Sequence, residues 1–182
     1  IEEDVWKLHA GVNVDMAFSF GKKFRVSPDV RAEYIFSDSY VLYGSATGGR
    51  ILSDFRRLEQ VNPYGVLIGQ NADTYEQLNS AIGYKMSPVN GLWFNIYGGY
   101  QHLRDELIAD NTLFYIGVNT HSTAYFMNSK TSNYYAGLQA NYNYKDVFNF
   151  MARGQYYDWN ADYKYALFFK PKYTLDFQIG VR

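Results

Sequence analysis

The chain has 182 residues, of which 17 are basic and 18 acidic, so its formal net charge is −1. This balance argues against nucleic acid as the main partner, because there is no excess of Lys and Arg to replace the counterions of phosphates. The absence of cysteine excludes a disulfide scaffold, a thiolate zinc site and a cysteine nucleophile.

No apolar run approaches the roughly 18 residues that a membrane helix needs. A membrane strand needs only about ten residues, and only every second one has to be apolar. Aromatic residues make up 19% of the chain, which suits such strands. The first residue is Ile1 and no signal peptide is visible, so we expect a mature form or a fragment of a longer protein.

The clearest pattern lies at residues 5–20, where every second residue is apolar and most of the residues between them are polar. Side chains alternate across a β-strand, so this pattern predicts a long strand with one apolar face. A helix would spread the same residues around its whole circumference. The apolar positions are Trp6, Leu8, Ala10, Val12, Val14, Met16, Phe18 and Phe20.

The same alternation recurs along the chain and predicts eight antiparallel strands and no helix. After the first, the predicted strands cover 24–36, 40–47, 75–86, 92–104, a segment ending with 134–144, then 148–156 and 173–181. Short turns are predicted at 21–23, 37–39, 87–91 and 145–146. The connections at 48–74 and 105–121 are long, and the one near 160–170 is of moderate length. The second is expected to be a polar loop, and an extended piece at 113–118 is left open.

The connections alternate in length along the chain. Most short turns fall on one rim and the long loops on the other, with 21–23 as the exception. This layout is typical of outer-membrane barrels. We therefore predict an all-β fold, an antiparallel transmembrane β-barrel with about eight strands in this chain, as one domain over residues 1–182.

Alternation alone does not show which face looks outward. A soluble lipocalin-like carrier would turn its apolar face inward around a ligand. Three features favour a membrane barrel: the strands are longer than usual in globular proteins, aromatic residues gather near strand ends, and the polar face carries charges of both signs. We accordingly expect lipid outside and polar groups inside.

Four segments resemble barrel strands of TonB-dependent outer-membrane receptors. They cover residues 42–49, 75–85, 92–100 and 171–177. The resemblance implies uptake of a scarce nutrient, such as a siderophore or a glycan, across the bacterial outer membrane. It also implies cargo binding by the long loops and an energy-coupling periplasmic protein as a partner.

The chain departs from that family in several ways. The plug domain and the energy-coupling box are absent, eight strands cannot enclose a plug, and the chain ends in Arg182 rather than an aromatic residue. We expect a late portion of a larger barrel, which would associate through its unpaired edge strands. The alternatives are a complete eight-stranded barrel with a structural, adhesive or lipid-modifying role, and a soluble lipocalin-like carrier.

Candidate ligand-binding residues lie in the first long loop and at a strand end. Arg50, Arg56 and Arg57 form a basic group in the loop, and guanidinium groups suit an anionic cargo. The alternative is a solvated loop in which these arginines pair with acidic neighbours. His102 and Arg104 are weaker candidates at the end of a predicted strand.

Catalysis is not expected. The fragment His121-Ser122-Thr123 fits poorly the spacing of small outer-membrane lipid A deacylases, and Asp105-Glu106 is interpreted as a solvated loop tip. No metal-ligand spacing is present, and no cofactor is predicted. The expected partners are outer-membrane lipid and a small-molecule or glycan cargo.

Overall fold

The computed structural model describes residues 5–16, 23–66, 72–116, 119–145, 147–164, 167 and 170–181. Its elements in chain order are β1 (Trp6–Met16), β2 (Phe24–Ser37), β3 (Tyr40–Ile51), α1 (Phe55–Val61), β4 (Gly65–Val66), β5 (Thr74–Val89), β6 (Leu92–Ile116), β7 (Asn119–Tyr144), β8 (Phe148–Ala161) and β9 (Tyr173–Val181). The all-β antiparallel fold predicted from the sequence is confirmed.

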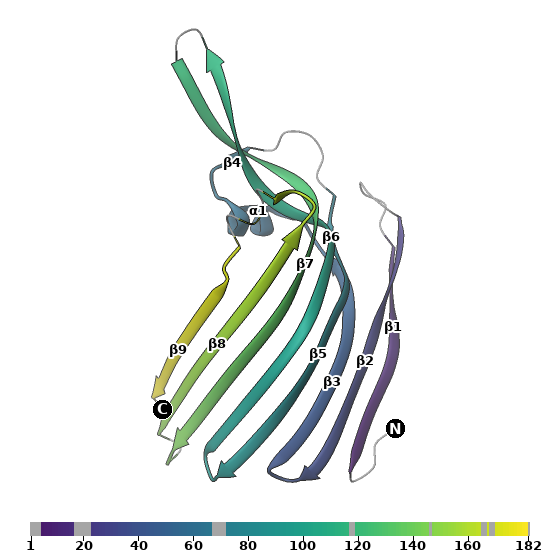
Figure 1. Cartoon of the computed structure of the whole chain (residues 1–182), viewed down its shortest axis with the longest axis vertical. Coiled ribbons are helices and arrows are strands. Elements are labelled where there is room, and N and C mark those ends of the chain that lie inside the picture. Colours follow the sequence, from purple (N-terminus) through teal and green to yellow (C-terminus); the bar gives the residue numbers. More distant parts are fainter. Residues whose placement is uncertain are drawn as a thin grey trace.

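The eight long strands form one sheet in the order β1-β2-β3-β5-β6-β7-β8-β9, with every neighbouring pair antiparallel. The short strand β4 pairs with β7 in parallel, away from this path. The turns β2–β3, β5–β6 and β7–β8 lie together at one rim (Figure 1). The opposite rim carries α1 and the projecting end of the β6–β7 hairpin.

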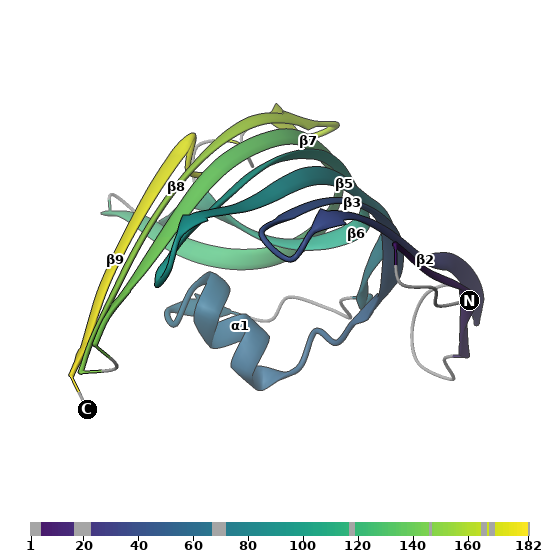
Figure 2. The ribbon, with the colours of Figure 1, turned by 90° about the horizontal axis from the view of Figure 1, so that it is seen from below.

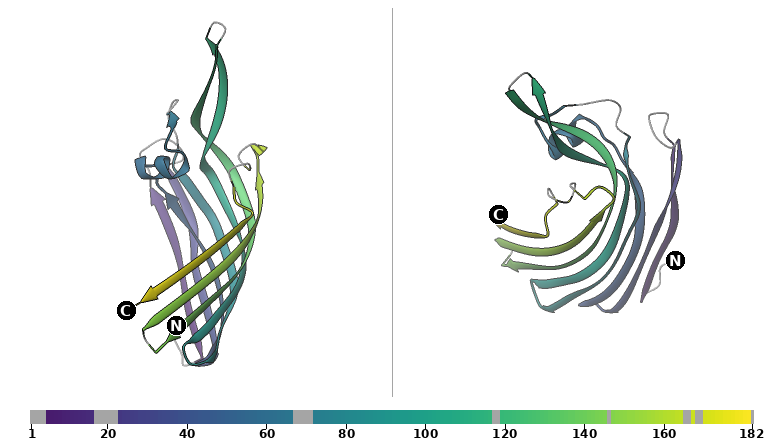
Figure 3. Two further views of the ribbon diagram at one scale, coloured as in Figure 1. Left: turned by 90° about the vertical axis from the view of Figure 1, so that its left-hand side faces the viewer. Right: turned by 45° about the horizontal axis from the view of Figure 1, so that its top comes forward.

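The sheet is strongly curved but does not close. Within the described strands, β1 and β9 are its two edges and do not pair with each other. Figure 2 shows the sheet as an arch, with α1 lying inside the curve. Figure 3 shows the same open arch from two sides, with the β6–β7 hairpin extending well beyond the neighbouring strands. The closed eight-stranded barrel considered above is therefore not formed by these strands.

One face of this sheet is apolar across all eight strands. The register aligns the apolar positions from strand to strand, for example Val14 opposite Val26, and Ile96 opposite Leu138. Many of these side chains are widely exposed, with Val12 at 65% and Phe177 at 75%. Such a large continuous apolar surface needs a hydrophobic partner, and a bilayer is the partner that matches strands of this length.

The other face is polar and lies on the concave side. It carries a cross-strand hydrogen bond between His9 and Asp29 and a cross-strand ion pair between Arg153 and Asp176. The side chain of Thr131 lies on this face and donates a hydrogen bond to Glu106. Glu106 lines a cavity together with residues of α1, which lies inside the arch. This arrangement, apolar outside and polar inside, is the reverse of a lipocalin-like carrier.

Tyrosines on the polar face pack against glycines of neighbouring strands. Tyr135 covers Gly99 and donates a hydrogen bond to the side chain of Asn79 at 2.8 Å. A Cβ atom at Gly99 would lie 2.5 Å from the Tyr135 hydroxyl oxygen and would also press on the backbone oxygen of Ser80. Glycine at this position therefore allows the ring to pack directly on the strand. The equivalent pairs are Tyr43 with Gly83 and Tyr97 with Gly137.

Two expectations about the loops were wrong. The connection 48–74, expected to contain no helix, holds α1, in which the Asp54 side chain accepts a hydrogen bond from the backbone N–H of Arg57 as an N-cap. The stretch 105–121 was expected to be a polar loop, with an extended piece at 113–118 left open. Residues 105–116 instead continue β6, residues 119–121 begin β7, and the two strands pair as a hairpin. The strand pattern is weak there because neither face of the projecting hairpin has to be continuously apolar.

Several strands are longer than predicted. Strand β3 continues to Ile51 instead of ending near 47, and β8 continues to Ala161 instead of 156. Strand β1 is described to Met16, so the predicted positions Phe18 and Phe20 and most of the turn 21–23 lie outside the described residues. In the part of the chain that is described, no helix has the length and apolarity needed to cross a membrane.

Candidate functional site

A β-bulge in β6 creates the most buried charged site in the described structure. Leu103 lies opposite Thr131, and Glu106 lies opposite Ser129, so three steps along β6 match two along β7. Asp105, inside this bulge, has φ 53°, a left-handed conformation that Asp tolerates better than most residues. The extra residue reverses the alternation beyond it, and this turns Glu106 toward the concave face.

Glu106 is held by two partners from distant parts of the chain. Its side chain is only 3% exposed and forms an ion pair with Lys170, which lies just before β9. The hydroxyl of Thr131 donates a hydrogen bond to the second carboxylate oxygen. A buried carboxylate requires such partners, because an unpaired charge in this position would be strongly destabilising. The prediction that Asp105-Glu106 forms a solvated loop tip was therefore wrong for Glu106.

Lys170 connects this carboxylate to an aromatic side chain. Its ammonium nitrogen lies 4.5 Å from the centre of the Trp159 ring, a cation–π geometry. The indole N–H of Trp159 donates to the backbone oxygen of Pro171 at 3.0 Å. The segment before β9 is thus attached to the concave face through β6 and β8.

The helix α1 covers this site from inside the arch. Arg57, Gln60 and Val61 lie on one face of α1, at positions i, i+3 and i+4. Together with residues 106–109 of β6 and Lys170 they line a partly open cavity of about 180 Å³. The cavity has both polar and apolar walls, as small-molecule sites do.

Arg57 brings an unsatisfied donor to the cavity. Its Nε is buried and has no hydrogen-bond partner among the described residues. Buried donors in folded proteins are almost always paired, with protein or with a bound molecule. Arg57 therefore combines a buried, unpaired Nε–H with a place in the cavity lining, and this is the feature of the structure that points most directly to a ligand.

A second set of polar contacts holds the strand ends around the site. Arg50 pairs with Asp73, and its Nε donates to a carboxylate oxygen of Asp73 at 2.8 Å. The other carboxylate oxygen of Asp73 accepts from the backbone N–H of Ser53 at 2.8 Å, just before α1. Arg25 pairs with Asp105 of the bulge and lies over the ring of Tyr75 at 4.7 Å. These contacts position the start of α1 and the bulge.

Of the five predicted ligand-binding residues, only Arg57 lines the cavity. Arg50 is engaged by Asp73, and Arg56 is exposed on α1. His102 stacks on Tyr100, whose ring contacts Tyr134 on the apolar face, so His102 lies on the outward side. Arg104 is exposed at the start of the bulge. His102 and Arg104 are thus not brought together with Arg57.

Sequence reasoning missed Glu106, Lys170 and Thr131. Alternation alone places Glu106 on the same face as Tyr100 and His102, and nothing local reveals the bulge that reverses it. One signal was available for α1, since Asp54 precedes the helical segment and Asn62-Pro63 follows it.

A small polar cluster lies further along the β6–β7 hairpin. The hydroxyl groups of Tyr125 and Tyr163 both donate to the same carboxylate oxygen of Asp110. Burial, and then the negative charge of Asp110, raise the pKa of the Tyr125 hydroxyl above its ordinary value. This cluster holds the segment after β8 against the hairpin. The side chains of residues 111–123, including His121-Ser122-Thr123, lie outside the described residues.

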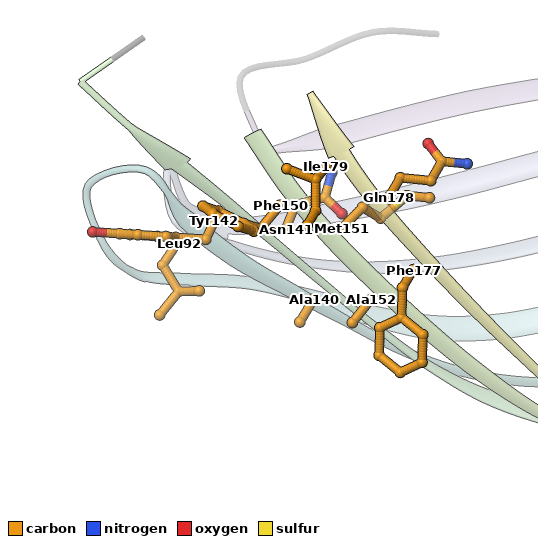
Figure 4. Close-up of a pocket in the computed structure, with 10 residues that line it drawn as sticks. All are labelled: Leu92, Ala140, Asn141, Tyr142, Phe150, Met151, Ala152, Phe177, Gln178 and Ile179. Atoms are coloured by element: carbon orange, nitrogen blue, oxygen red, sulfur yellow. The ribbon is translucent and has the colours of Figure 1, made fainter. Parts of the chain in front are cut away.

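The apolar face has a groove near the turn rim, shown in Figure 4. Its volume is about 270 Å³, and the small side chains of Ala140 and Ala152 form its floor between larger neighbours. Leu92 and Phe177 point to the same side as these alanines, whereas Gln178 points to the other side of the sheet (Figure 4). The groove is therefore a part of the apolar convex face and is separate from the cavity beside α1.

The described residues contain no cluster of three or more His, Cys, Asp or Glu side chains that could hold a metal ion. Glu106 is engaged by an ion pair with Lys170 and a hydrogen bond from Thr131, which satisfy both oxygens of its carboxylate.

Comparison with known proteins gives a fold but no family. No family model matches the chain, and no curated protein matches it. A solved structure described as "Copper transporter OprC" is similar, with a TM-score of 0.53 and 13% sequence identity. The match covers 87% of this chain and 27% of the transporter's chain, so the chain spans about a quarter of that protein's length. At this identity the likeness shows a shared barrel fold.

Proposed function

We propose that the chain forms part of the wall of a bacterial outer-membrane β-barrel of the TonB-dependent receptor type, and that it takes part in the uptake of a scarce nutrient. The observation that carries this proposal is the division of one curved sheet into an apolar convex face and a charged concave face. The helix α1 and its cavity lie on the concave side, where a solute would pass.

Two further observations support uptake. Four segments of the sequence resemble receptor strands, and the structure that matches the fold is described as a transporter. Copper is not carried over as the cargo, because 13% identity extends to the fold alone. The proposed cargo is a small molecule or a glycan, and the proposed partner is an energy-coupling periplasmic protein.

The membrane part of this proposal is tested by fractionation and by electrophoresis. We expect the protein encoded by the complete gene to fractionate with the outer membrane. We also expect it to migrate differently with and without heating in detergent, as a stable barrel does. Recovery in the soluble fraction without detergent, with no heat-dependent shift, would overturn the membrane assignment.

The uptake part is tested in cells with and without the gene. Cells are supplied with a panel of ferric siderophores and short maltodextrins, and accumulation of each is measured. We expect one class of solute to accumulate only when the gene is present, and accumulation to stop when the energy-coupling protein is removed. Equal accumulation of every solute in both strains would overturn the uptake assignment.

A further inference from the structure

We propose that the cavity between α1 and β6 is a binding site for an oxyanion group, a carboxylate or a phosphate, with Arg57 as its main ligand. This proposal rests on the proposed function, because it assigns the chemistry of the group on the cargo that binds there. The argument depends on the hydrogen bonding of Arg57, on the charge balance of the cavity and on its size.

The first step is the unsatisfied donor. The backbone N–H of Arg57 donates to the Asp54 side chain at 3.0 Å, which engages the backbone of this residue but not its guanidinium group. The side-chain Nε is buried without a partner among the described residues. Burying a polar N–H without an acceptor costs on the order of 1–3 kcal/mol. The group that would recover this cost is an acceptor inside the cavity.

The second step is the charge of that acceptor. Two cations, Arg57 and Lys170, and one anion, Glu106, line the cavity. Lys170 and Glu106 neutralise each other in an ion pair, which leaves the positive charge of Arg57 uncompensated within the cavity lining. A planar guanidinium binds carboxylate and phosphate oxygens through parallel hydrogen bonds, so an oxyanion matches both the charge and the geometry.

The third step is the space available. The cavity measures about 180 Å³, and cavities of about 150 Å³ accept a molecule of the size of benzene. A carboxylate or phosphate group therefore fits beside Arg57. Gln60 lines the same wall one helical turn further on, and its side-chain amide offers further donors to such a group.

The test uses the complete protein in detergent and titrates it with inorganic phosphate and, separately, with acetate. Binding is followed by calorimetry for the unaltered protein and for Arg57→Gln and Arg56→Gln. Arg56 is the matched control, because it precedes Arg57 on the same helix but is exposed. We expect Arg57→Gln to weaken binding about tenfold or more, since it removes a charge-assisted hydrogen bond. Arg56→Gln should change it less than about twofold.

A second measurement needs no variant. Phenylglyoxal modifies accessible arginines, and mass spectrometry of peptides identifies the modified residue. Phosphate or acetate at saturating concentration should slow modification of Arg57 and leave Arg56 unaffected. Protection by phosphate alone would assign a phosphate group, and protection by acetate alone a carboxylate.

The proposal is overturned if the unaltered protein binds neither anion, or if both arginine substitutions weaken binding equally. It is also overturned if neither anion protects Arg57. These outcomes leave the uptake proposal standing, because uptake is measured independently in cells. Conversely, anion binding with the expected pattern in a protein that transports nothing would support the anion site and overturn uptake.

Discussion

At the scale of single residues, the Glu106–Lys170 pair illustrates how burial changes the contribution of an ion pair to stability. The Glu106 side chain is 3% exposed, and Lys170 is 18% exposed. The pair between Arg153 and Asp176 lies on the same concave face, but its side chains are 41% and 45% exposed. Water screens the exposed Arg153–Asp176 pair, so this pair contributes little to stability. Removing one partner of the buried Glu106–Lys170 pair leaves an unpaired buried charge, which is strongly destabilising.

We predict that Glu106→Gln lowers the free energy of unfolding by about 3–5 kcal/mol, because Lys170 then loses its counter-charge. The matched variant Asp176→Asn should cost less than about 1 kcal/mol. Denaturant unfolding in detergent, followed by tryptophan fluorescence, measures both. Equal effects of the two substitutions would show that burial does not distinguish these pairs.

Alanine substitutions of glycines on the two faces of the sheet are predicted to differ in their effect on stability. At Gly99, a methyl group would press on the Tyr135 ring and on the backbone of Ser80. We predict that Gly99→Ala destabilises the protein by about 1–3 kcal/mol through overpacking. At Gly44 the nearest atom to an added Cβ is 3.8 Å away, so Gly44→Ala should change stability by less than about 1 kcal/mol. Heat-dependent migration in detergent compares the two variants, and a Gly44 effect as large as that at Gly99 would contradict the packing argument.

At the scale of elements, the bulge in β6 determines which face carries Glu106. Three residues of β6 match two of β7 between Leu103 and Glu106. A shift of one residue moves every following side chain to the opposite face of a sheet. The bulge therefore sets which face the side chains of β6 occupy from Glu106 onward, including residues 106–109 in the wall of the cavity.

Deletion of Arg104 tests this role of the bulge. We predict that the deletion removes the bulge but leaves Glu106 opposite Ser129 on the concave face, because Leu103, Asp105 and Glu106 then alternate regularly. The folded band in heat-modification electrophoresis should therefore remain. The substitution Arg104→Ala keeps the residue count and changes only an exposed side chain, so the folded band should remain. Loss of the folded band in the deletion variant alone would contradict this account of the register.

At the scale of the whole molecule, the orientation of the two faces is open to direct measurement through the three tryptophans. Trp6 lies on the apolar face and is 53% exposed. Trp93 lies opposite Asn141, on the polar face by alternation, and Trp159 lies under Lys170. In vesicles containing brominated lipid we predict strong quenching of Trp6 fluorescence and weak quenching of the other two. Variants that keep one tryptophan each, with Phe at the other two positions, provide the comparison. Stronger quenching of Trp93 or Trp159 than of Trp6 would reverse the assignment of the faces.

The open edges of the sheet lead to a second prediction at this scale. The outer edges of β9 and of residues 9–16 of β1 have no neighbouring strand among the described residues, and unpaired backbone groups are costly in lipid. We predict that the 182-residue chain, folded by itself in detergent, associates through these edges. The chain has no cysteine, so single cysteines at Asn13 in β1 and Gln178 in β9 report edge contacts between copies by cross-linking. A monomer without cross-links would contradict the prediction.

The strands and their two faces were predictable because alternation is a local property. Residues 6–16 show the apolar and polar faces of β1 without reference to any other part of the chain. The positions of the short turns followed from local residue types in the same way. The continuation of β6 through residues 105–116, paired with β7, and the helix α1 were not predicted, because neither carries a continuous apolar face.

Alternation in the sequence by itself determined the all-β fold, the separation of apolar and polar faces and the rim on which most short turns lie. Only the tertiary structure decided that the polar face is concave, that a bulge turns Glu106 inward and that Lys170 meets it from 64 residues away. The physical reason is that alternation depends on neighbours in the chain, whereas curvature, bulges and buried ion pairs depend on which strands lie side by side.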